Sequence, residues 1–357
     1  MNFSQVYGNE AVKKTLMGMA DSGRVPHALL LYENEGCGAL ALALAFFRYL
    51  NCPSKGHDSC GECPACKQIS HLTYPDMHFS FPITSGSKVD GAVKDLTCKM
   101  FSPYWKELLA KNPYFMENEL GPALGFEKKA GAITVAEGKS IIRDMSLSTV
   151  ADGWRGIFIY LPEKMNVQTA NMLLKSLEEP AEKTIFILIT HAPEDLLPTI
   201  SSRCQGIRIL PLRKEEIEKA LKEGFGAGEQ AAALAAENSG GSLGAAIQAL
   251  SEMEEGSVNG QLFSSLVESV LSGDLEGALS AAETVVALDS REKQKAFCIF
   301  AGGAIRKMLF EGKISASFAE KALSVFSRSA GMLQRNVSQK MIFCNMATRL
   351  YVVGRKK

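Results

Sequence analysis

The sequence has no excess of charge of either sign. Its 357 residues carry 39 Lys and Arg against 39 Asp and Glu, so the formal net charge is zero. A protein that holds nucleic acid through a general basic surface is therefore not indicated, although local phosphate contacts remain open. The sequence also has no apolar run long enough to span a bilayer, and its start, MNFSQVYGNE, lacks the layout of a signal peptide. These absences predict a cytoplasmic location and no membrane partner.

Cysteine, by contrast, is abundant, and four of the nine cysteines lie close together. Cys52, Cys60, Cys63 and Cys66 have seven, two and two residues between them. Two overlapping C-x-x-C pairs, with a fourth cysteine within loop reach, suit Zn²⁺, which prefers four thiolates in a tetrahedron. Redox-active or merely buried cysteines are the alternative. We expect a structural zinc module at about residues 52–66, because four protein ligands leave no position for water.

The middle of the sequence has the pattern of a strand, a helix and a second strand. Residues 157–161 and 185–189 are short runs rich in Ile and Phe, typical of strands buried on both faces. Between them, Asn166 is placed to cap a helix that Pro180 would end. The predicted apolar face of this helix comprises Val167, Ala170, Leu173, Leu174 and Leu177. The three elements predict a parallel βαβ unit.

An earlier strand candidate, residues 28–32, is followed by a glycine-containing loop and a helix candidate. A loop at this place can bind phosphate, because amide groups and the helix N-terminus attract anions. Gly36 and Gly38 keep the turn, but Ala39 and Leu40 stand where Lys and Ser or Thr would meet phosphate and Mg²⁺. Glu33 replaces the first glycine of the pattern and would repel phosphate at close range. The sequence therefore favours a tight turn without a bound nucleotide.

The end of the strand at residues 157–161 also lacks the groups that an ATPase needs. Paired acids normally stand there to hold Mg²⁺ and orient water, whereas this chain has Leu161 and Pro162. Glu163 follows in that loop, and we expect it to be a solvated acid. Thr190, after the next strand, is expected to satisfy a turn rather than to contact a γ-phosphate.

The remaining regions show no catalytic constellation. Residues 84–131 are punctuated by Gly, Ser and Pro and carry several aromatic residues, which favours a packed excursion over a docking surface. From residue 213 onward the apolar spacing is helical, with helices predicted at 215–223, 229–237 and 243–253 and a further helical region over 261–351. The soft segment 254–259 is the predicted boundary of that last region.

Several sequence blocks resemble those of a known family. VYGNEAVKKTL, HALLLY, the cysteine module, YPD, NMLLKSLEEP and ISSRC are similar, in the same order, to blocks of the bacterial replicative clamp loader, within the AAA+ class. The resemblance covers about residues 3–79 and 133–250, more loosely 256–357, and leaves 84–131 without a counterpart. It implies an α/β fold, in which an AAA+ type P-loop parallel sheet with helices (1–212) precedes a small helical lid domain (213–254) and an all-α C-terminal collar domain (255–357).

The departures from the motor subunits of that family all concern ATP. Ala39, Leu40, Leu161 and Pro162 replace groups that grip nucleotide, and Gly244 stands where motor subunits carry a nucleotide-sensing Arg. Together with the retained SRC tripeptide, the pattern resembles that of the delta-prime subunits, the non-hydrolysing members of the loader. The resemblance implies no productive ATP binding and no catalysis by this chain alone. A divergent AAA+ ATPase subunit that still binds or hydrolyses ATP is the alternative.

Arg203 is the residue to which the resemblance gives a chemical role. It follows the second strand of the βαβ unit, on the side where AAA+ subunits meet, so its guanidinium is placed to reach the γ-phosphate of a neighbour's ATP. Such an arginine finger in trans is worth about 10³ to 10⁵ in rate in GTPases. Ser202 and Cys204 are expected to shape its turn. Without the family context, a surface salt bridge is the plainer role.

The resemblance also implies partners. They are the other clamp-loader subunits, motor ATPase subunits and a delta-like subunit, in a hetero-pentamer of DNA polymerase III. Contacts with the sliding clamp and primer–template DNA are expected mainly through that complex. A cysteine module that itself binds nucleic acid is a weaker reading, because only Lys55 and Lys67 supply positive charge close to the cysteines.

Overall fold

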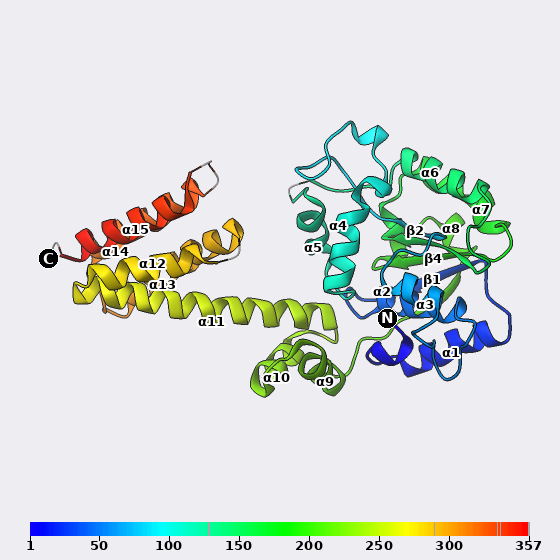
Figure 1. Cartoon of the computed structure of the whole chain (residues 1–357), viewed down its shortest axis with the longest axis horizontal. Coiled ribbons are helices and arrows are strands. Elements are labelled where there is room, and N and C mark those ends of the chain that lie inside the picture. The colour runs from blue at the N-terminus through cyan, green and yellow to red at the C-terminus, as the bar shows by residue number, and fades with distance from the viewer. Residues whose placement is uncertain (128, 289, 334, 336, 356–357) are drawn as a thin grey trace. The chain divides into compact units, whose positions relative to one another are not determined.

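The chain forms two compact units, Met1–Leu250 and Ser251–Lys357. The computed structural model describes residues 1–357 except 128, 289, 334, 336 and 356–357 (Figure 1). The first unit contains a sheet with flanking helices, and the described residues of the second are helical with short connections (Figure 1). The predicted α/β class, a parallel sheet with helices, is confirmed, as is a helical C-terminal region over the described residues.

A five-stranded parallel sheet forms the centre of the first unit, with the strand order β2-β3-β4-β1-β5. The strands are β1 (Ala28–Tyr32), β2 (Met77–Ser80), β3 (Arg155–Tyr160), β4 (Thr184–Thr190) and β5 (Gln205–Arg208). Every residue of β3 and β4 is buried, which explains why both are largely apolar in sequence. Tyr32 pairs with Thr190, and Tyr160 pairs with Ile189. The carboxyl ends of β1, β3 and β4 therefore lie side by side, and the loops that follow them meet.

Helices cover both faces of the sheet. Leu29 and Leu31 belong to one apolar cluster, which includes nearly all of α2, whereas Leu30 belongs to a second cluster with α7. The helices of this unit are α1 (Glu10–Asp21), α2 (Ala39–Leu50), α3 (Pro64–Ser70), α4 (Cys98–Lys111), α5 (Glu117–Leu124), α6 (Val135–Ser146), α7 (Val167–Glu178), α8 (Pro198–Ser201), α9 (Lys214–Phe225) and α10 (Glu229–Asn238). Short 3₁₀ helices are η1 (Phe3–Gln5), η2 (Val93–Asp95), η3 (Pro162–Lys164) and η4 (Pro193–Asp195).

The predicted βαβ unit is confirmed as β3–α7–β4, with β3 and β4 parallel. The side-chain oxygen of Asn166 accepts a hydrogen bond from the Thr169 amide at 2.8 Å, so it caps α7 as expected. The helix ends at Glu178, two residues before Pro180. One part of the prediction is wrong: Val167 is 59% exposed, because it is the first residue of the helix and lies at the end of the apolar stripe.

The excursion at residues 84–131 is packed, as the sequence predicts. It contains α4 and α5, and an antiparallel bridge between Ile83 and Ala132 holds its two ends together. Trp105 on α4 is 1% exposed and stacks on Phe81, with ring centroids 4.1 Å apart. Its edge meets Phe115 of the same excursion at a centroid distance of 5.7 Å. The aromatic residues of this region therefore build a core rather than a free docking surface.

Helix α11 (Leu243–Ser272) is longer than the sequence predicts. We expected a helix over 243–253 and a soft boundary at 254–259, but the helix continues through that segment, and the division between the two units falls within it. A single glycine such as Gly256 costs a helix only about 1 kcal/mol relative to Ala, which longer-range packing can offset. The three-domain limits at residues 212 and 254 stay a prediction.

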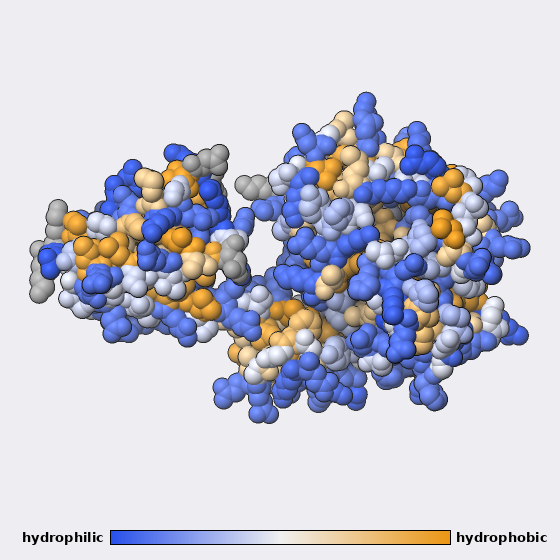
Figure 2. All heavy atoms as spheres, in the orientation of Figure 1, coloured by the Kyte–Doolittle hydropathy of each residue, from blue (hydrophilic) through white to orange (hydrophobic). Residues whose placement is uncertain are grey.

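The C-terminal unit is built from the end of α11 and from α12 (Leu275–Val286), α13 (Arg291–Phe310), α14 (Ala316–Met332) and α15 (Gln339–Arg355). Phe297, Phe326 and Phe343 lie at its centre and are at most 1% exposed. Large apolar side chains also reach its surface, including Phe310 at 90% and Met341 at 69% exposure. Figure 2 shows apolar atoms interspersed with hydrophilic ones on this unit. Across the described parts of the chain, we find no helix with the length and apolarity that crossing a membrane requires.

Candidate functional site

The loop between β1 and α2, residues 33–38, is held by the chain's own carboxylate. Gly36 and Gly38 adopt left-handed φ angles of 76° and 109°, which a turn of this kind reserves for glycine. The Glu33 side chain is buried, and its Oε2 accepts a hydrogen bond from the Ala39 amide at 2.7 Å. This amide belongs to the first turn of α2, where a bound anion would be favoured. Glu33 therefore supplies the negative charge that the N-terminus of α2 attracts.

The excursion covers this loop, which sequence reasoning missed. A Cβ added to Gly38 would lie 2.8 Å from Cε1 of Tyr114, and one added to Gly36 would lie 3.0 Å from Sδ of Met116. Tyr114 is 3% exposed, and its hydroxyl accepts a hydrogen bond from the Tyr7 amide at 3.3 Å. The Glu117 amide donates to the carboxylate of Glu35 in the loop. Tyr114, Met116 and Glu117 therefore contact the loop directly.

The start of α11 closes the loop from another side. The Gly244 amide donates to the Gly36 carbonyl at 3.0 Å, and the Ser242 hydroxyl donates to the Glu35 carbonyl at 2.7 Å. Ser242 also caps α11, since its hydroxyl oxygen accepts from the Ala245 amide at 3.1 Å. A Cβ at position 244 would collide with the carbonyl oxygen of Tyr114. The packing thus excludes any side chain, Arg included, at this position.

The loop after β3 contains no paired acids, since Glu163 is the one acid of η3. Leu161 is fully buried with a left-handed φ of 57°, and Pro162 begins η3. The Thr190 hydroxyl donates to Glu163 Oε2 at 2.7 Å and accepts from the Ala192 amide at 3.2 Å, so Thr190 does satisfy a turn. Glu163 is not the solvated acid that we expected. Burial is the main cause that raises the pKa of its carboxyl above the usual value, against the opposing hydrogen bond from Thr190.

Arg203 lies in the turn between α8 and β5 and is held by two groups of its own chain. Its Nε donates to Glu178 Oε1 at 2.5 Å, Nη2 forms an ion pair with the same oxygen, and Nη1 donates to the Thr199 carbonyl at 2.9 Å. The side chain remains 33% exposed. Ser202 and Cys204 belong to the same turn, since their backbone amides donate hydrogen bonds to the carbonyls of residues 198 and 201, respectively. These contacts engage Nε and both terminal nitrogens, and each terminal nitrogen keeps a second N–H group.

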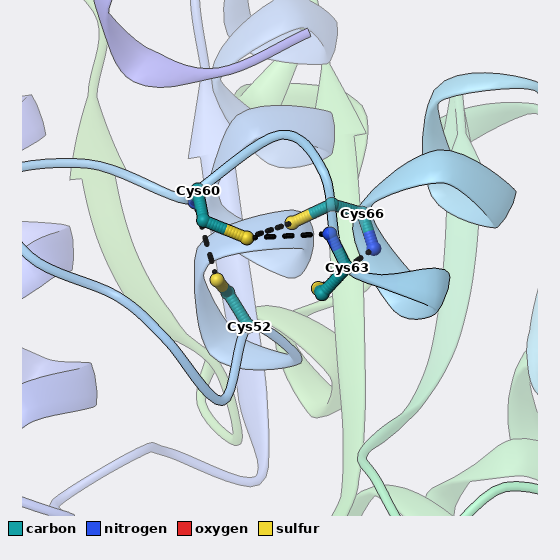
Figure 3. Close-up of side chains that lie close together, drawn as sticks. All are labelled: Cys52, Cys60, Cys63 and Cys66. Carbon is teal, nitrogen blue, oxygen red and sulfur yellow. Dashed lines mark hydrogen bonds between the residues drawn. The ribbon is translucent and has the colours of Figure 1, made fainter.

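The four clustered cysteines converge between the end of α2 and the start of α3 (Figure 3). The sulfurs of Cys52, Cys60, Cys63 and Cys66 all lie within 4.8 Å of one another, and those of Cys60 and Cys66 are 4.0 Å apart. A tetrahedron with Zn–S bonds of about 2.3 Å requires sulfurs ~3.8 Å apart. The donor set and its spacing therefore fit Zn²⁺. His57 and His71 do not join this group.

Backbone amides donate to three of these sulfurs and favour the thiolate form against the effect of burial. The Cys60 amide donates to the Cys52 sulfur at 3.2 Å. The Cys63 amide donates to the Cys60 sulfur, and the Cys66 amide to the Cys63 sulfur, each at 3.4 Å. Amide donors from Cys63 and Glu62 lower the pKa of the Cys60 thiol to about 6, whereas burial raises the pKa of the Cys52 thiol and raises that of the Cys63 thiol to about 12. All four residues are free thiols without disulfide partners. The four sulfurs are therefore placed so that they could hold one metal ion.

These features define an α/β protein with a parallel sheet and a closed glycine loop at the carboxyl end of its central strands. Residues 8–213, more than half of the chain, match the model of a family described as DNA polymerase III, delta subunit. The chain belongs to this family.

Two relatives agree with the match. A protein named DNA polymerase III subunit delta' from Escherichia coli (strain K12) is 31% identical over 269 residues, which is 74% of this chain and 66% of that protein. One of the same name from Yersinia pestis is 29% identical over 192 residues, or 54% of this chain and 44% of that protein. The chain therefore spans between about half and two thirds of the length of these relatives. A solved structure of a DNA polymerase III gamma subunit-related protein from Thermotoga maritima is 16% identical, with a TM-score of 0.39, covering 96% of this chain and 99% of that one.

Proposed function

We propose that this chain is a delta-prime-type, non-hydrolysing subunit of the replicative clamp loader of DNA polymerase III. In this role it helps to load the sliding clamp on primed DNA and donates Arg203 to the ATP site of a neighbouring motor subunit. Family membership and the names of the relatives support the complex. The site geometry supports both parts of this role, since the chain's own glycine loop is closed and the Arg203 side chain is partly exposed.

One observation carries the proposal: the Glu33 carboxylate lies against the Ala39 amide, where a phosphate would need to bind. A second negative charge about 4 Å away would cost about 4 kcal/mol at an effective dielectric constant of 20. No lysine or hydroxyl at positions 39 and 40 offsets this repulsion. Tyr114, Met116 and Gly244 leave little space around the glycines. We infer that this chain binds no ATP productively.

We assign Arg203 to stabilising the transition state of ATP hydrolysis in a neighbouring subunit. Glu178 holds Nε and Nη2 and the Thr199 carbonyl holds Nη1, so the second N–H of each terminal nitrogen is the group that would pair with a phosphate of another subunit. The hydrogen bond from Nη1 to the Thr199 carbonyl limits rotation of the Arg203 guanidinium. An exposed ion pair of this type adds little stability, typically about 0–1 kcal/mol, so stability alone does not account for the arrangement.

The cysteine cluster is assigned to structural zinc. The ion would be held by Cys52, Cys60, Cys63 and Cys66, with no open position for chemistry. It would tie the end of α2 to α3 and thereby hold the 52–66 module together. The remaining assignments follow the family: motor ATPase and delta-like subunits in a hetero-pentamer, action in the cytoplasm, and a lid (213–254) and collar (255–357) after the sheet domain.

Two measurements test the proposal. The purified chain should show no ATPase activity and no Mg²⁺-dependent binding of a fluorescent ATP analogue. In a loader reconstituted with its motor subunits, Arg203→Ala should depress ATP hydrolysis, whereas Arg208→Ala, an exposed arginine on β5, should not. Tight Mg²⁺-dependent binding by the chain alone would favour the divergent ATPase instead, and full hydrolysis with Arg203→Ala would refute the finger.

A further inference from the structure

Three metal-ligating side chains meet beside the closed glycine loop. Glu35 belongs to the loop after β1, Glu117 begins α5 in the excursion, and His191 follows β4. One ligand atom of each, two carboxylate oxygens and a ring nitrogen, lie within 4.8 Å of one another. The group is separate from the cysteine module, with which it shares no residue.

His191 has an unsatisfied nitrogen in this group. Its side chain is only 10% exposed, and its Nε2 lies 3.6 Å from Glu33 Oε1. The other oxygen of Glu33 is fixed by the Ala39 amide at 2.7 Å, so the carboxylate is anchored. Within the described residues, the buried Nδ1 has no hydrogen-bond partner. A histidine with one nitrogen beside a carboxylate and the other buried without a partner matches the usual arrangement of a metal ligand and its supporting acid.

The two carboxylates each keep an oxygen for a ligand. Glu35 Oε1 accepts from the Glu117 amide, and Glu117 Oε1 lies 3.3 Å from the Lys164 ammonium. Lys164 is 44% exposed, so solvent weakens its compensation of the charge. With Glu33 included, three carboxylates gather around one imidazole. A divalent cation would balance this charge and give the unpartnered Nδ1 a partner.

We propose that Glu35, Glu117 and His191 bind one divalent first-row transition-metal ion, with Glu33 as the residue that orients His191. A set of two carboxylates and one imidazole suits Mn²⁺ or Zn²⁺ better than Mg²⁺ or Ca²⁺, which prefer oxygen ligands alone. The ion ties the excursion to the glycine loop and to the end of β4. This site depends neither on the arginine finger nor on the absence of ATP.

The test uses the full chain with its cysteine module loaded with zinc. Mn²⁺ is the probe, because it has the lowest affinity in the divalent series and leaves the zinc thiolates intact. Electron paramagnetic resonance of free Mn²⁺ should show one ion bound per chain. Glu117→Gln and His191→Ala should each weaken binding at least about tenfold, whereas Glu119→Gln on the same helix should bind as the wild type does.

Two further variants keep the result decisive if a substitution disturbs folding. Glu35→Gln retains the oxygen that accepts from the Glu117 amide, and Glu33→Gln retains the one that accepts from the Ala39 amide. Both should fold with the wild-type circular dichroism spectrum yet lose affinity, Glu33→Gln by about 10- to 100-fold. A wild-type chain that binds no Mn²⁺, or folded variants that bind it unchanged, would overturn the proposal.

Discussion

Replacing Tyr114 by Ala should destabilise the first unit strongly, because this side chain closes the glycine loop. Tyr114 is 3% exposed and its ring lies against Gly38, while its hydroxyl accepts from the Tyr7 amide. Removing a buried aromatic ring costs about 3–5 kcal/mol, and losing one hydrogen bond costs about 0.5–1.5 kcal/mol. Tyr114→Phe removes only the hydroxyl. We therefore expect the Ala variant to lose about 2–4 kcal/mol more free energy of unfolding than the Phe variant.

The assay is denaturant unfolding followed by tryptophan fluorescence. The chain has two tryptophans, Trp105 and Trp154, and both belong to the first unit, so the signal reports on that unit alone. Equal losses in Tyr114→Ala and Tyr114→Phe would refute the packing of the excursion on the loop. The Ala variant should still bind no ATP, since the Glu33 carboxylate remains at the Ala39 amide.

Three further predictions concern other parts of the chain. Cys63→Ser should reduce the zinc content of the purified chain from about one ion to none, when no metal is added during purification. Inductively coupled plasma emission spectroscopy measures this content, and an unchanged value would contradict the site. Glu178→Ala should lower the turnover number of a reconstituted loader with little change in KM for ATP; Glu178→Gln, which still accepts from Arg203, should restore it, and Glu179→Ala should have no effect. For Glu137, burial raises the pKa of the carboxyl above its usual 4.5. The protonated carboxyl therefore contributes to the free energy of unfolding in full below pH 4.5, and this contribution is lost as pH rises through the folded-state pKa. Glu137→Gln, which retains an oxygen for the Cys98 amide, should therefore be more stable than the wild type at pH 7 but not at pH 4, as urea unfolding at the two pH values would show.

Much of the fold follows from local sequence. The apolar runs predict β1, β3 and β4 to within two residues at each end, and the Asn166 cap predicts the start of α7. Helix α11 was predicted too short, because a glycine and a serine suggest a break that the helix does not make. The residues at which helices and strands end depend on packing against distant residues, and the local sequence pattern does not contain this information.

The candidate site was only partly predictable. The missing Lys, hydroxyl and acids were visible in sequence, as was the cysteine spacing. The roles of Tyr114 and Met116 were not, because they lie about 80 residues from the loop that they cover and carry no motif. The absence of a side chain at Gly244 was one usable signal, since a close approach of backbone requires glycine there. His191 was missed because a single histidine after a strand has no spacing pattern.

The central claim is that this chain acts on a neighbour's ATP through Arg203 and not on its own. Single-turnover hydrolysis at the adjoining motor site, in a loader that contains Arg203→Ala, tests it most directly. We predict that hydrolysis at that site falls by about 10³-fold or more while ATP still binds there, with Arg208→Ala at the wild-type rate. An unchanged single-turnover rate in the Arg203→Ala loader would contradict the account.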